Sequence, residues 1–339
     1  MTTNQIGHDL ATKFSLGTFN HNGLEKLTRA FLDDLQEKGG PAIFTLSPEK
    51  ARAVLSELQA GVTVKMLPAE IENRTIPGGP SENGTSITIV RPPNSRNETL
   101  PVVIYIHGGG WVLGGFDTHE RLVRELANKA NVVIVFVNYT PSPEAKYPVA
   151  IEQAYTATKW VAENDKTINV NSSRLAVVGD SVGGNMAAAV TMLAKERGGP
   201  SIRFQVLFYP VTDASFDTPS YMTYQNGYWL LRDGMKWFWS NYLTNQTNIK
   251  DPTVSPLQAS VEQLKGLPPA LIINAENDLL RDEGEAYALK LLEAGVPVAA
   301  VRYHGTIHDF VMLNVITDDP APRTAIEQAC IVLKNVMAE

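Results

Sequence analysis

The chain has 339 residues, 44% of them hydrophobic, so it is long enough to bury a large core in one α/β unit or in about two domains. Its formal net charge of -7 argues against a nucleic-acid partner, and its single cysteine, Cys330, excludes an intramolecular disulfide. The N-terminus shows no secretory signal, and no apolar run approaches the roughly 18 residues of a membrane helix, so we expect a cytoplasmic protein without a membrane span.

The first predicted elements are helices. In "GLEKLTRAFLDDLQ", one amphipathic face at helical spacing is formed by Leu24, Leu27, Phe31 and Leu35. A second helix is predicted over "EKARAVLSELQ", because Ser47 supplies an N-cap and Pro48 occupies the first turn.

Strand and helix patterns then alternate along the chain. We expect strands at residues 86–92, 102–107, 132–139, 174–179, 204–210, 269–278 and 296–305. We expect helices at residues 118–130 and 147–164, directly after residue 181, and at 283–295. The β-branched run at 132–139 is apolar throughout, which is typical of a strand buried on both faces. This order predicts an α/β fold with a mostly parallel central sheet and helices on both faces.

An aromatic insertion, residues 211–251, interrupts this alternation. It contains a predicted helix at 232–243 and lies between two predicted strands. A long insertion at such a place is typical of a lid or of one wall of a binding site. Its aromatic side chains are also expected to pack on the core, and we expect both descriptions to be partly true.

A lone serine lies on a glycine-rich corner between a buried strand and a buried helix. The motif Gly179-Asp180-Ser181-Val182-Gly183 fits G-x-S-x-G in the strand–turn–helix setting that it requires. Glycine is expected on both sides because a Cβ there would collide with the neighbouring strand or helix. The turn raises the serine hydroxyl above the sheet and brings the first amides of the next helix beside it, where they face developing negative charge.

Three consecutive glycines follow a predicted strand in "VVIYIHGGGWVLGG". Such a run costs backbone entropy, so it is favoured where the backbone must approach another group closely. Between His107 and Trp111 it offers N–H donors that no side chain obstructs. We therefore expect a functional loop here rather than a merely flexible one.

A serine nucleophile needs a base, and the base needs an acid that orients it. After the predicted strand "ALIINA" the candidate acids are Glu276, Asp278, Asp282 and Glu283. Asp282 and Glu283 fall where a helix begins, and an acid there usually caps the helix or interacts with its dipole. Asp278 follows the strand closely enough to turn back over the sheet edge, so it is the preferred acid.

Two histidines occur in "HGTIHDF", after the last predicted strand. His304 touches the strand end and is expected to be a partly buried or surface imidazole. His308 lies one loop further, before an aromatic residue that could anchor the next helix, and it is the preferred base. The remaining histidines, His8, His21 and His119, lie outside this pattern, and no cluster with metal-ligand spacing is visible.

The motifs HGGGW, GDSVGGN, DLLRDEGEAYA and HGTIHDF, in this order, resemble those of the hormone-sensitive-lipase-like esterases of the α/β-hydrolase fold, also called bacterial family IV esterases. The resemblance extends from about residue 86 over most of the remaining chain. It implies Ser181 as the nucleophile, His308 as the base and Asp278 as the orienting acid. It also implies an oxyanion hole formed by the amides of Gly109, Gly110 and Val182. His107 is expected to shape its loop rather than to take part in the chemistry.

Members of this family carry a helical cap over a catalytic core. The resemblance implies a cap from residues 1–55 with 211–250, and an α/β-hydrolase core from residues 56–210 with 251–339. Many members are dimers, so the resemblance also allows for a homodimer.

Three positions depart from the family pattern. Val182 stands where alanine is commonest, and its larger side chain could narrow the pocket while leaving the amide available. Asp309 stands where glycine is commonest, and an extra carboxylate there is expected to raise the pKa of His308. Leu279-Leu280 replaces a common Pro-Leu, which loosens the loop after the acid slightly.

The expected function is a carboxylesterase that hydrolyses small-molecule, short-chain acyl esters through an acyl-enzyme, without a cofactor or a metal. An amidase, a formamidase or a long-chain lipase would use the same groups, although an aromatic-rich cap favours a bounded pocket over long lipids. A non-catalytic small-molecule receptor is a further alternative, but receptors of this fold typically lack a triad residue and this chain has all three. Activity is expected to reach a plateau above the pKa of His308, at near neutral to mildly alkaline pH.

Overall fold

An eight-stranded sheet forms the centre of the computed structural model, which describes residues 23–338. Its strands are β1 (Glu70–Ile76), β2 (Thr85–Arg91), β3 (Leu100–Ile106), β4 (Val133–Asn138), β5 (Val170–Asp180), β6 (Phe204–Phe208), β7 (Ala270–Asn277) and β8 (Val298–Ile307). They lie in the order β1-β2-β4-β3-β5-β6-β7-β8. β2 pairs antiparallel with both of its neighbours, and all pairs from β4 to β8 are parallel.

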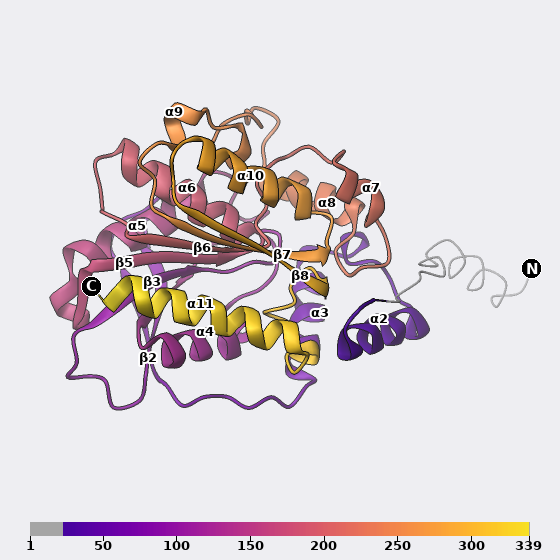
Figure 1. The fold of residues 1–339 in the computed structure, drawn as a ribbon, viewed down its shortest axis with the longest axis horizontal. Helices are drawn as coiled ribbons and strands as arrows, with labels where there is room; N and C mark the ends of the chain where they lie inside the picture. The colour runs from indigo at the N-terminus through magenta and orange to yellow at the C-terminus, as the bar shows by residue number, and fades with distance from the viewer. Residues whose placement is uncertain (1–22, 339) are drawn as a thin grey trace, which may run out of the picture.

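Helices cover both faces of this sheet. The longer ones are α2 (Lys26–Lys38), α3 (Pro48–Ala60), α4 (Phe116–Ala130), α5 (Val149–Glu163), α6 (Val182–Glu196), α8 (Arg232–Tyr242), α10 (Arg281–Glu293) and α11 (Pro320–Ala338). Short turns of helix are α7 (Pro219–Thr223), α9 (Val261–Leu264), η1 (Ile43–Thr45), η2 (Asp165–Ile168), η3 (Pro256–Gln258) and η4 (Asn314–Ile316). α4 and α11 lie on one face, and α5, α6 and α10 lie on the other (Figure 1). The predicted α/β fold is confirmed. Within residues 23–338, no helix has both the length and the apolar character needed to cross a membrane.

The central strands follow the apolar runs of the sequence. Every residue of β3 is buried, as is every residue of β4 except Asn138, which is expected of parallel strands covered on both faces. The sequence patterns do not predict β1, because its residues "EIENRTI" include a single buried one, Ile76. This edge strand is held by its antiparallel pairing with β2, the next strand along the chain, and not by burial of its own side chains.

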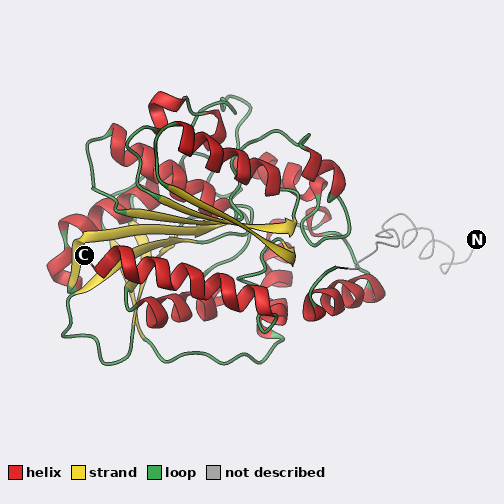
Figure 2. Cartoon of the chain, viewed as in Figure 1, coloured by secondary structure: helices red, strands yellow, loops and turns green. Residues whose placement is uncertain are grey.

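Four helices, α2, α3, α7 and α8, gather beyond the carboxyl ends of the central strands (Figure 2). We call them the cap helices. They come from the two segments that the sequence assigns to a cap, although α3 continues to residue 60 and residues 1–22 lie outside the described residues. The side chain of Ser47 accepts a hydrogen bond from the Lys50 N–H at the start of α3, which confirms the predicted N-cap.

The first cap helix is fastened to the C-terminal part of the chain. The N–H and the hydroxyl of Thr28 both donate to Asp319 Oδ2, at 2.8 and 2.9 Å. The Leu27 N–H donates to Asp319 Oδ1 at 3.0 Å. Just before α2, the Glu25 N–H donates to the carbonyl of Gly305, in β8, at 3.0 Å. α2 is therefore joined both to the last strand of the sheet and to the start of α11.

Candidate active site

Ser181 lies on a tight turn between β5 and α6. Its φ of 54° is in the left-handed region, which a residue with a side chain seldom occupies and which is typical of a strained functional turn. A Cβ on Gly183 would overlap the carbonyl of Ile106 in β3, and a Cβ on Gly179 would overlap the carbonyl of Gly183. The predicted requirement for glycine on both sides of the serine is therefore found.

The structure brings together the side chains of Ser181, Asp278 and His308. His308 Nε2 lies 2.9 Å from Ser181 Oγ, and His308 Nδ1 lies 2.7 Å from Asp278 Oδ2. Asp278 directly follows β7 and His308 directly follows β8. Because these strands are parallel, both residues lie at the carboxyl ends of the strands, where Ser181 follows β5. All three are buried, with Ser181 only 4% exposed. A hydroxyl, an imidazole and a carboxylate in this order can move a proton from the hydroxyl to the imidazole.

The other candidate acids and the other candidate base have separate partners. The exposed ring of His304 lies 2.7 Å from Glu276 Oε1, which agrees with a surface imidazole. Asp282 and Glu283 lie in the first turn of α10, as predicted. Each accepts a hydrogen bond at 2.7 Å from a backbone N–H of residues 212–220, so they hold the start of the aromatic insertion rather than cap their own helix.

The glycine loop after β3 lies beside the serine turn. Asp180 Oδ1 accepts a hydrogen bond from the Gly108 N–H at 3.1 Å. Gly109 and Gly110 have φ values of 100° and 63°, and a Cβ on Gly110 would overlap the ring of Phe238 in α8. Among residues 23–338, the N–H groups of these two glycines meet no protein acceptor, which leaves them able to donate to a bound group.

Asp180 is the centre of a buried network that the sequence analysis does not identify. Its carboxylate accepts a hydrogen bond from the Tyr105 hydroxyl at 2.7 Å and lies 3.2 Å from His119 Nε2. Burial raises the pKa of Asp180, but His119 and Tyr105 outweigh burial and hold that pKa below its usual value. Burial lowers the pKa of His119, but Asp180 outweighs burial and raises it. His119, which the sequence leaves outside the site pattern, is thus part of the support beneath Ser181.

Asp180→Asn is expected to lower the free energy of unfolding by about 3 kcal/mol, because it removes one member of a fully buried ion pair. The control is Asp34→Asn, which breaks the exposed pair between Asp34 and Lys38 on α2 and should cost less than about 1 kcal/mol. Urea denaturation of both variants measures the difference. Equal, small losses would show that the Asp180 network carries little stability.

Two carboxylates face His308. Asp309 Oδ1 lies 3.4 Å from His308 Nε2, in addition to the contact of Asp278 with Nδ1. Burial lowers the pKa of His308, but Asp278 and Asp309 outweigh burial and raise it to about 9. As the sequence predicts, Asp309 raises the pKa of His308. Tyr209 packs edge-on against the imidazole with ring centroids 4.8 Å apart and fixes the plane of the ring.

The aromatic insertion contacts both the site and the core. Trp229 Nε1 donates to Asp309 Oδ2 at 2.9 Å, and the Trp229 ring centroid lies 5.4 Å from that of Phe31 in α2. Tyr242, at the end of α8, stacks instead on the buried ring of Trp111, with centroids 4.1 Å apart. The two cap segments therefore meet each other directly beside His308.

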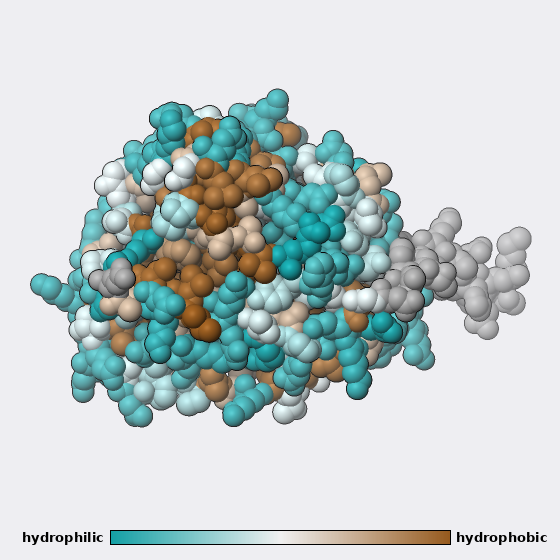
Figure 3. Space-filling model, viewed as in Figure 1, coloured by the Kyte–Doolittle hydropathy of each residue, from teal (hydrophilic) through white to brown (hydrophobic). Residues whose placement is uncertain are grey.

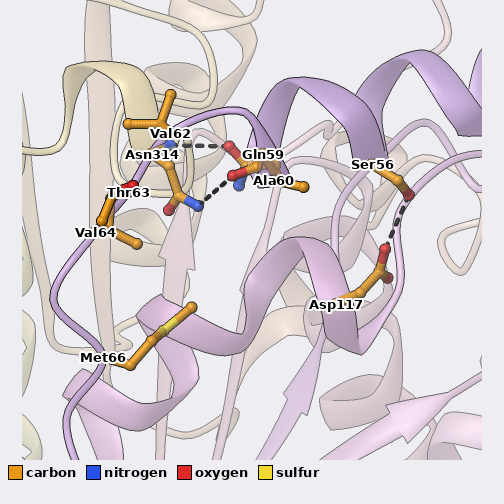
Figure 4. A pocket seen from close by; sticks show the side chains of 9 residues that line it. All are labelled: Ser56, Gln59, Ala60, Val62, Thr63, Val64, Met66, Asp117 and Asn314. Carbon is orange, nitrogen blue, oxygen red and sulfur yellow. Dashed lines mark hydrogen bonds between the residues drawn. The ribbon is translucent and has the colours of Figure 1, made fainter.

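A surface hollow of about 300 Å³ lies away from these residues, between α3 and residues 62–66 (Figure 4). At its wall, Gln59 Oε1 accepts the Asn314 N–H at 2.9 Å, and Gln59 Nε2 donates to the Thr118 carbonyl at 2.6 Å. These bonds fasten α3 to the start of α4 and to the loop that follows His308. Within residues 23–338, no cluster of His, Cys, Asp and Glu could hold a metal ion, and the histidines at positions 8 and 21 lie outside the described residues.

Comparisons with known proteins agree with one another. A family model described as the alpha/beta hydrolase fold matches residues 103–312. Carboxylesterase NlhH of Mycobacterium tuberculosis is 38% identical over 302 residues, which cover 88% of this chain and 92% of that protein. Ethyl acetate hydrolase of Pseudomonas putida is 38% identical over 235 residues, which cover 69% of this chain and 73% of that protein. The crystal structure of a thermostable esterase from Pseudomonas putida ECU1011 has a TM-score of 0.92 and 51% identity, and covers 94% of this chain and 99% of that one.

Proposed function

Because the chain belongs to the hormone-sensitive-lipase-like esterases of the α/β-hydrolase fold and is a carboxylic ester hydrolase, we propose that it hydrolyses short-chain acyl esters through Ser181, His308 and Asp278. The observation that carries the proposal is the continuous contact from Ser181 Oγ through both ring nitrogens of His308 to Asp278. In this proposal Ser181 is the nucleophile, His308 the general base, and Asp278 the acid that orients the imidazole.

The proposed reaction has two halves. In the first, His308 Nε2 takes the Ser181 proton while Oγ bonds to the ester carbonyl carbon, and the histidine then protonates the departing alcohol. In the second, water repeats the attack on the acyl-enzyme and releases the acid. Asp278 keeps Nδ1 protonated throughout, so that Nε2 presents its lone pair to Ser181.

The proposed oxyanion hole consists of the N–H groups of Gly109, Gly110 and Val182. The glycine N–H groups have no protein acceptor among the described residues, and Val182 begins α6, where backbone N–H groups have no partner within the helix. Together they would meet the negative charge that develops on the carbonyl oxygen. Losing one such donor typically costs a factor of about 10²–10³ in rate.

A short acyl chain is favoured by how closely the cap lies over the site. The ring of Phe238 contacts the backbone of Gly110, and Trp229 reaches the residue after His308. We assign the cap to residues 1–55 with 211–250, and the catalytic core to 56–210 with 251–339. The name of the related ethyl acetate hydrolase also refers to a small ester.

The test is a series of p-nitrophenyl esters from acetate to palmitate, together with the matching anilide of butyrate. We expect the highest kcat/KM at butyrate or shorter and little turnover of the anilide. A p-nitrophenyl phosphonate should label the peptide that contains Ser181, detected by mass spectrometry. Faster turnover of palmitate would favour a lipase, faster turnover of the anilide an amidase, and a label on another serine would remove Ser181 as the nucleophile.

The kcat/KM for p-nitrophenyl butyrate is expected to rise with pH to a plateau above about 9, a more alkaline position than the sequence predicts. His308 accepts a proton only when neutral, and Asp278 and Asp309 raise its pKa to about 9 against the lowering effect of burial. Because this pKa lies above the ordinary value of 6.5, His308 stabilises the fold fully below pH 6.5, and this contribution is lost as the pH rises through 9. Rate profiles and thermal melts against pH measure both effects, and a rate that levels off below pH 7 would contradict the assignment.

We further propose a homodimer formed through the exposed edge strand β8. Exposed apolar side chains gather over α10, β8 and α11 (Figure 3). The residues are Leu289, Leu292, Ala299, Ala300 and Ile331. A second copy is the fitting occupant, because an edge strand can pair antiparallel with its own twofold copy while flanking apolar side chains cover one another.

Light scattering during size-exclusion chromatography tests the dimer. Leu289→Glu combined with Ile331→Glu should convert a dimer into a monomer, because both side chains are more than half exposed on this face. Met222→Glu changes an exposed apolar residue of α7, outside the face, and should leave the mass unchanged. A monomeric wild type would contradict the proposal.

A further inference from the structure

Asp309 places a second carboxylate at the nitrogen of His308 that faces Ser181. Asp309 Oδ1 lies 3.4 Å from His308 Nε2, the atom that lies 2.9 Å from Ser181 Oγ. The other carboxylate oxygen, Oδ2, accepts the hydrogen bond from Trp229 Nε1 at 2.9 Å. Asp309 is 8% exposed, so the carboxylate is held in one place by the indole and by its surroundings.

The oxygen that points toward the histidine has no hydrogen-bond donor. Among residues 23–338, Asp309 Oδ1 is a buried side-chain oxygen without a protein partner. Buried acceptors are nearly always hydrogen-bonded. An unpaired carboxylate oxygen beside the reacting atoms is therefore expected to accept a hydrogen bond from a molecule that enters the site during the reaction. The ester itself brings none to this position, because its carbonyl and ether oxygens only accept hydrogen bonds. The water of the second half-reaction brings two O–H donors.

Building on the proposed function, we propose that Asp309 positions the water that hydrolyses the acyl-enzyme. One proton of this water is directed to His308 Nε2 and the other to Asp309 Oδ1. Two acceptors 3.4 Å apart suit a single water, since with hydrogen bonds of about 2.8 Å to both, each O–H would point within roughly 15° of the direction to its acceptor. The water oxygen is thereby held beside the acyl group on Ser181, with its lone pair free to attack.

The step balances with these groups alone. The water oxygen bonds to the acyl carbon, the carbonyl π pair moves onto the carbonyl oxygen, and the first water proton passes to His308 Nε2. On collapse the bond from carbon to Ser181 Oγ breaks, and His308 returns its proton to Oγ. The second water proton stays on the product acid, having been oriented by Asp309 during the attack.

This arrangement distinguishes water from an alcohol as the acyl acceptor. An alcohol carries one O–H proton, which His308 Nε2 must take, so it has none for Asp309 Oδ1. Its alkyl group would also lie against a buried carboxylate and leave that charge without a hydrogen bond, which is unfavourable. Asp309 therefore favours hydrolysis over transfer to alcohols. Because Trp229 fixes the carboxylate, the cap contributes to this preference.

The test measures how the acyl-enzyme divides between water and methanol. Wild type, Asp309→Gly, Asp309→Asn and Trp229→Phe are each given p-nitrophenyl butyrate at a series of methanol concentrations, and butyric acid and methyl butyrate are quantified by gas chromatography. The product ratio does not depend on the amount of folded enzyme or on the rate of acylation. Glycine and asparagine both tolerate the φ of 64° at this position. Glu276→Gln, which changes the carboxylate beside the exposed His304, is the matched control.

Asp309→Gly should raise the ratio of methyl butyrate to butyric acid by about tenfold, the effect of losing a hydrogen bond to a charged acceptor. Asp309→Asn keeps an acceptor oxygen without the charge and should raise the ratio by about threefold. Trp229→Phe should shift it in the same direction, and Glu276→Gln should leave it unchanged. An unchanged ratio in both Asp309 variants, or an equal shift in the control, would overturn the inference. Failure of the wild type to form either product would instead overturn the proposed function.

Discussion

Ser181→Ala is expected to lower the turnover of p-nitrophenyl butyrate by about 10⁵-fold or more while the protein stays folded. The hydroxyl oxygen is the atom that becomes acylated in the proposed reaction, and His308 Nε2, 2.9 Å away, removes its proton in the first half-reaction. Removing one buried oxygen from this turn leaves the glycine contacts around it unchanged. Initial rates and the circular dichroism spectrum of the same preparation measure the two expectations.

The matched control for this variant is Ser240→Ala. That serine lies on α8, is exposed, and donates only to a carbonyl of its own helix at 2.8 Å, so full activity is expected. A small residual rate in Ser181→Ala is consistent with the proposal, because an intact oxyanion hole still stabilises direct attack by water. If Ser181→Ala retained a tenth of the wild-type rate, which is far above this residual rate, Ser181 would not be the nucleophile.

Asp278→Asn is expected to lower kcat by about 10⁴-fold with little change in structure. The carboxylate accepts the proton of His308 Nδ1 at 2.7 Å and thereby keeps the lone pair on Nε2, toward Ser181. An asparagine can donate to Nδ1 instead, which stabilises the tautomer with a proton on Nε2. In that tautomer the histidine cannot accept the serine proton, even at alkaline pH.

The rival acid supplies the control for this second variant. Glu276→Gln changes a carboxylate of β7 that contacts the exposed His304, and near-wild-type kcat is expected. If Glu276→Gln lost as much activity as Asp278→Asn, the orienting acid would be wrongly assigned. Removing the charge of Asp278 also removes a cause of the raised His308 pKa, so any residual activity should reach its plateau at lower pH.

Features that the sequence predicts well are those marked by local patterns. Ser181 stands in a motif whose glycines are each required by a contact that a Cβ would break. Asp278 and His308 each follow a strand that is visible as an apolar or β-branched run, and parallel strands deliver their ends to one edge of the sheet. The α/β fold is predicted by the alternation of strand and helix patterns of hydrophobic residues along the chain.

Features that the sequence does not predict depend on contacts between distant segments. His119 pairs with Asp180, 61 residues further along, and nothing near it in the sequence marks it as part of the site. Trp229 is one aromatic residue among many in its insertion, and only the folded cap brings its indole to Asp309. Asp309 itself is visible as a departure from a family pattern, but the direction of each carboxylate oxygen depends on a backbone with φ of 64°.

The attachment of α2 connects the cap to β8, the strand that ends just before His308, and not to the turn that carries Ser181. Glu25 is bonded to Gly305, three residues before His308, whereas Ser181 stands between β5 and α6 in the middle of the sheet. We expect a displacement of α2 that admits substrate to move the end of β8, and with it the proposed base His308, more than the proposed nucleophile Ser181. We expect an opened cap to hold a misaligned histidine, so that the serine is activated only once the cap has closed over the bound ester.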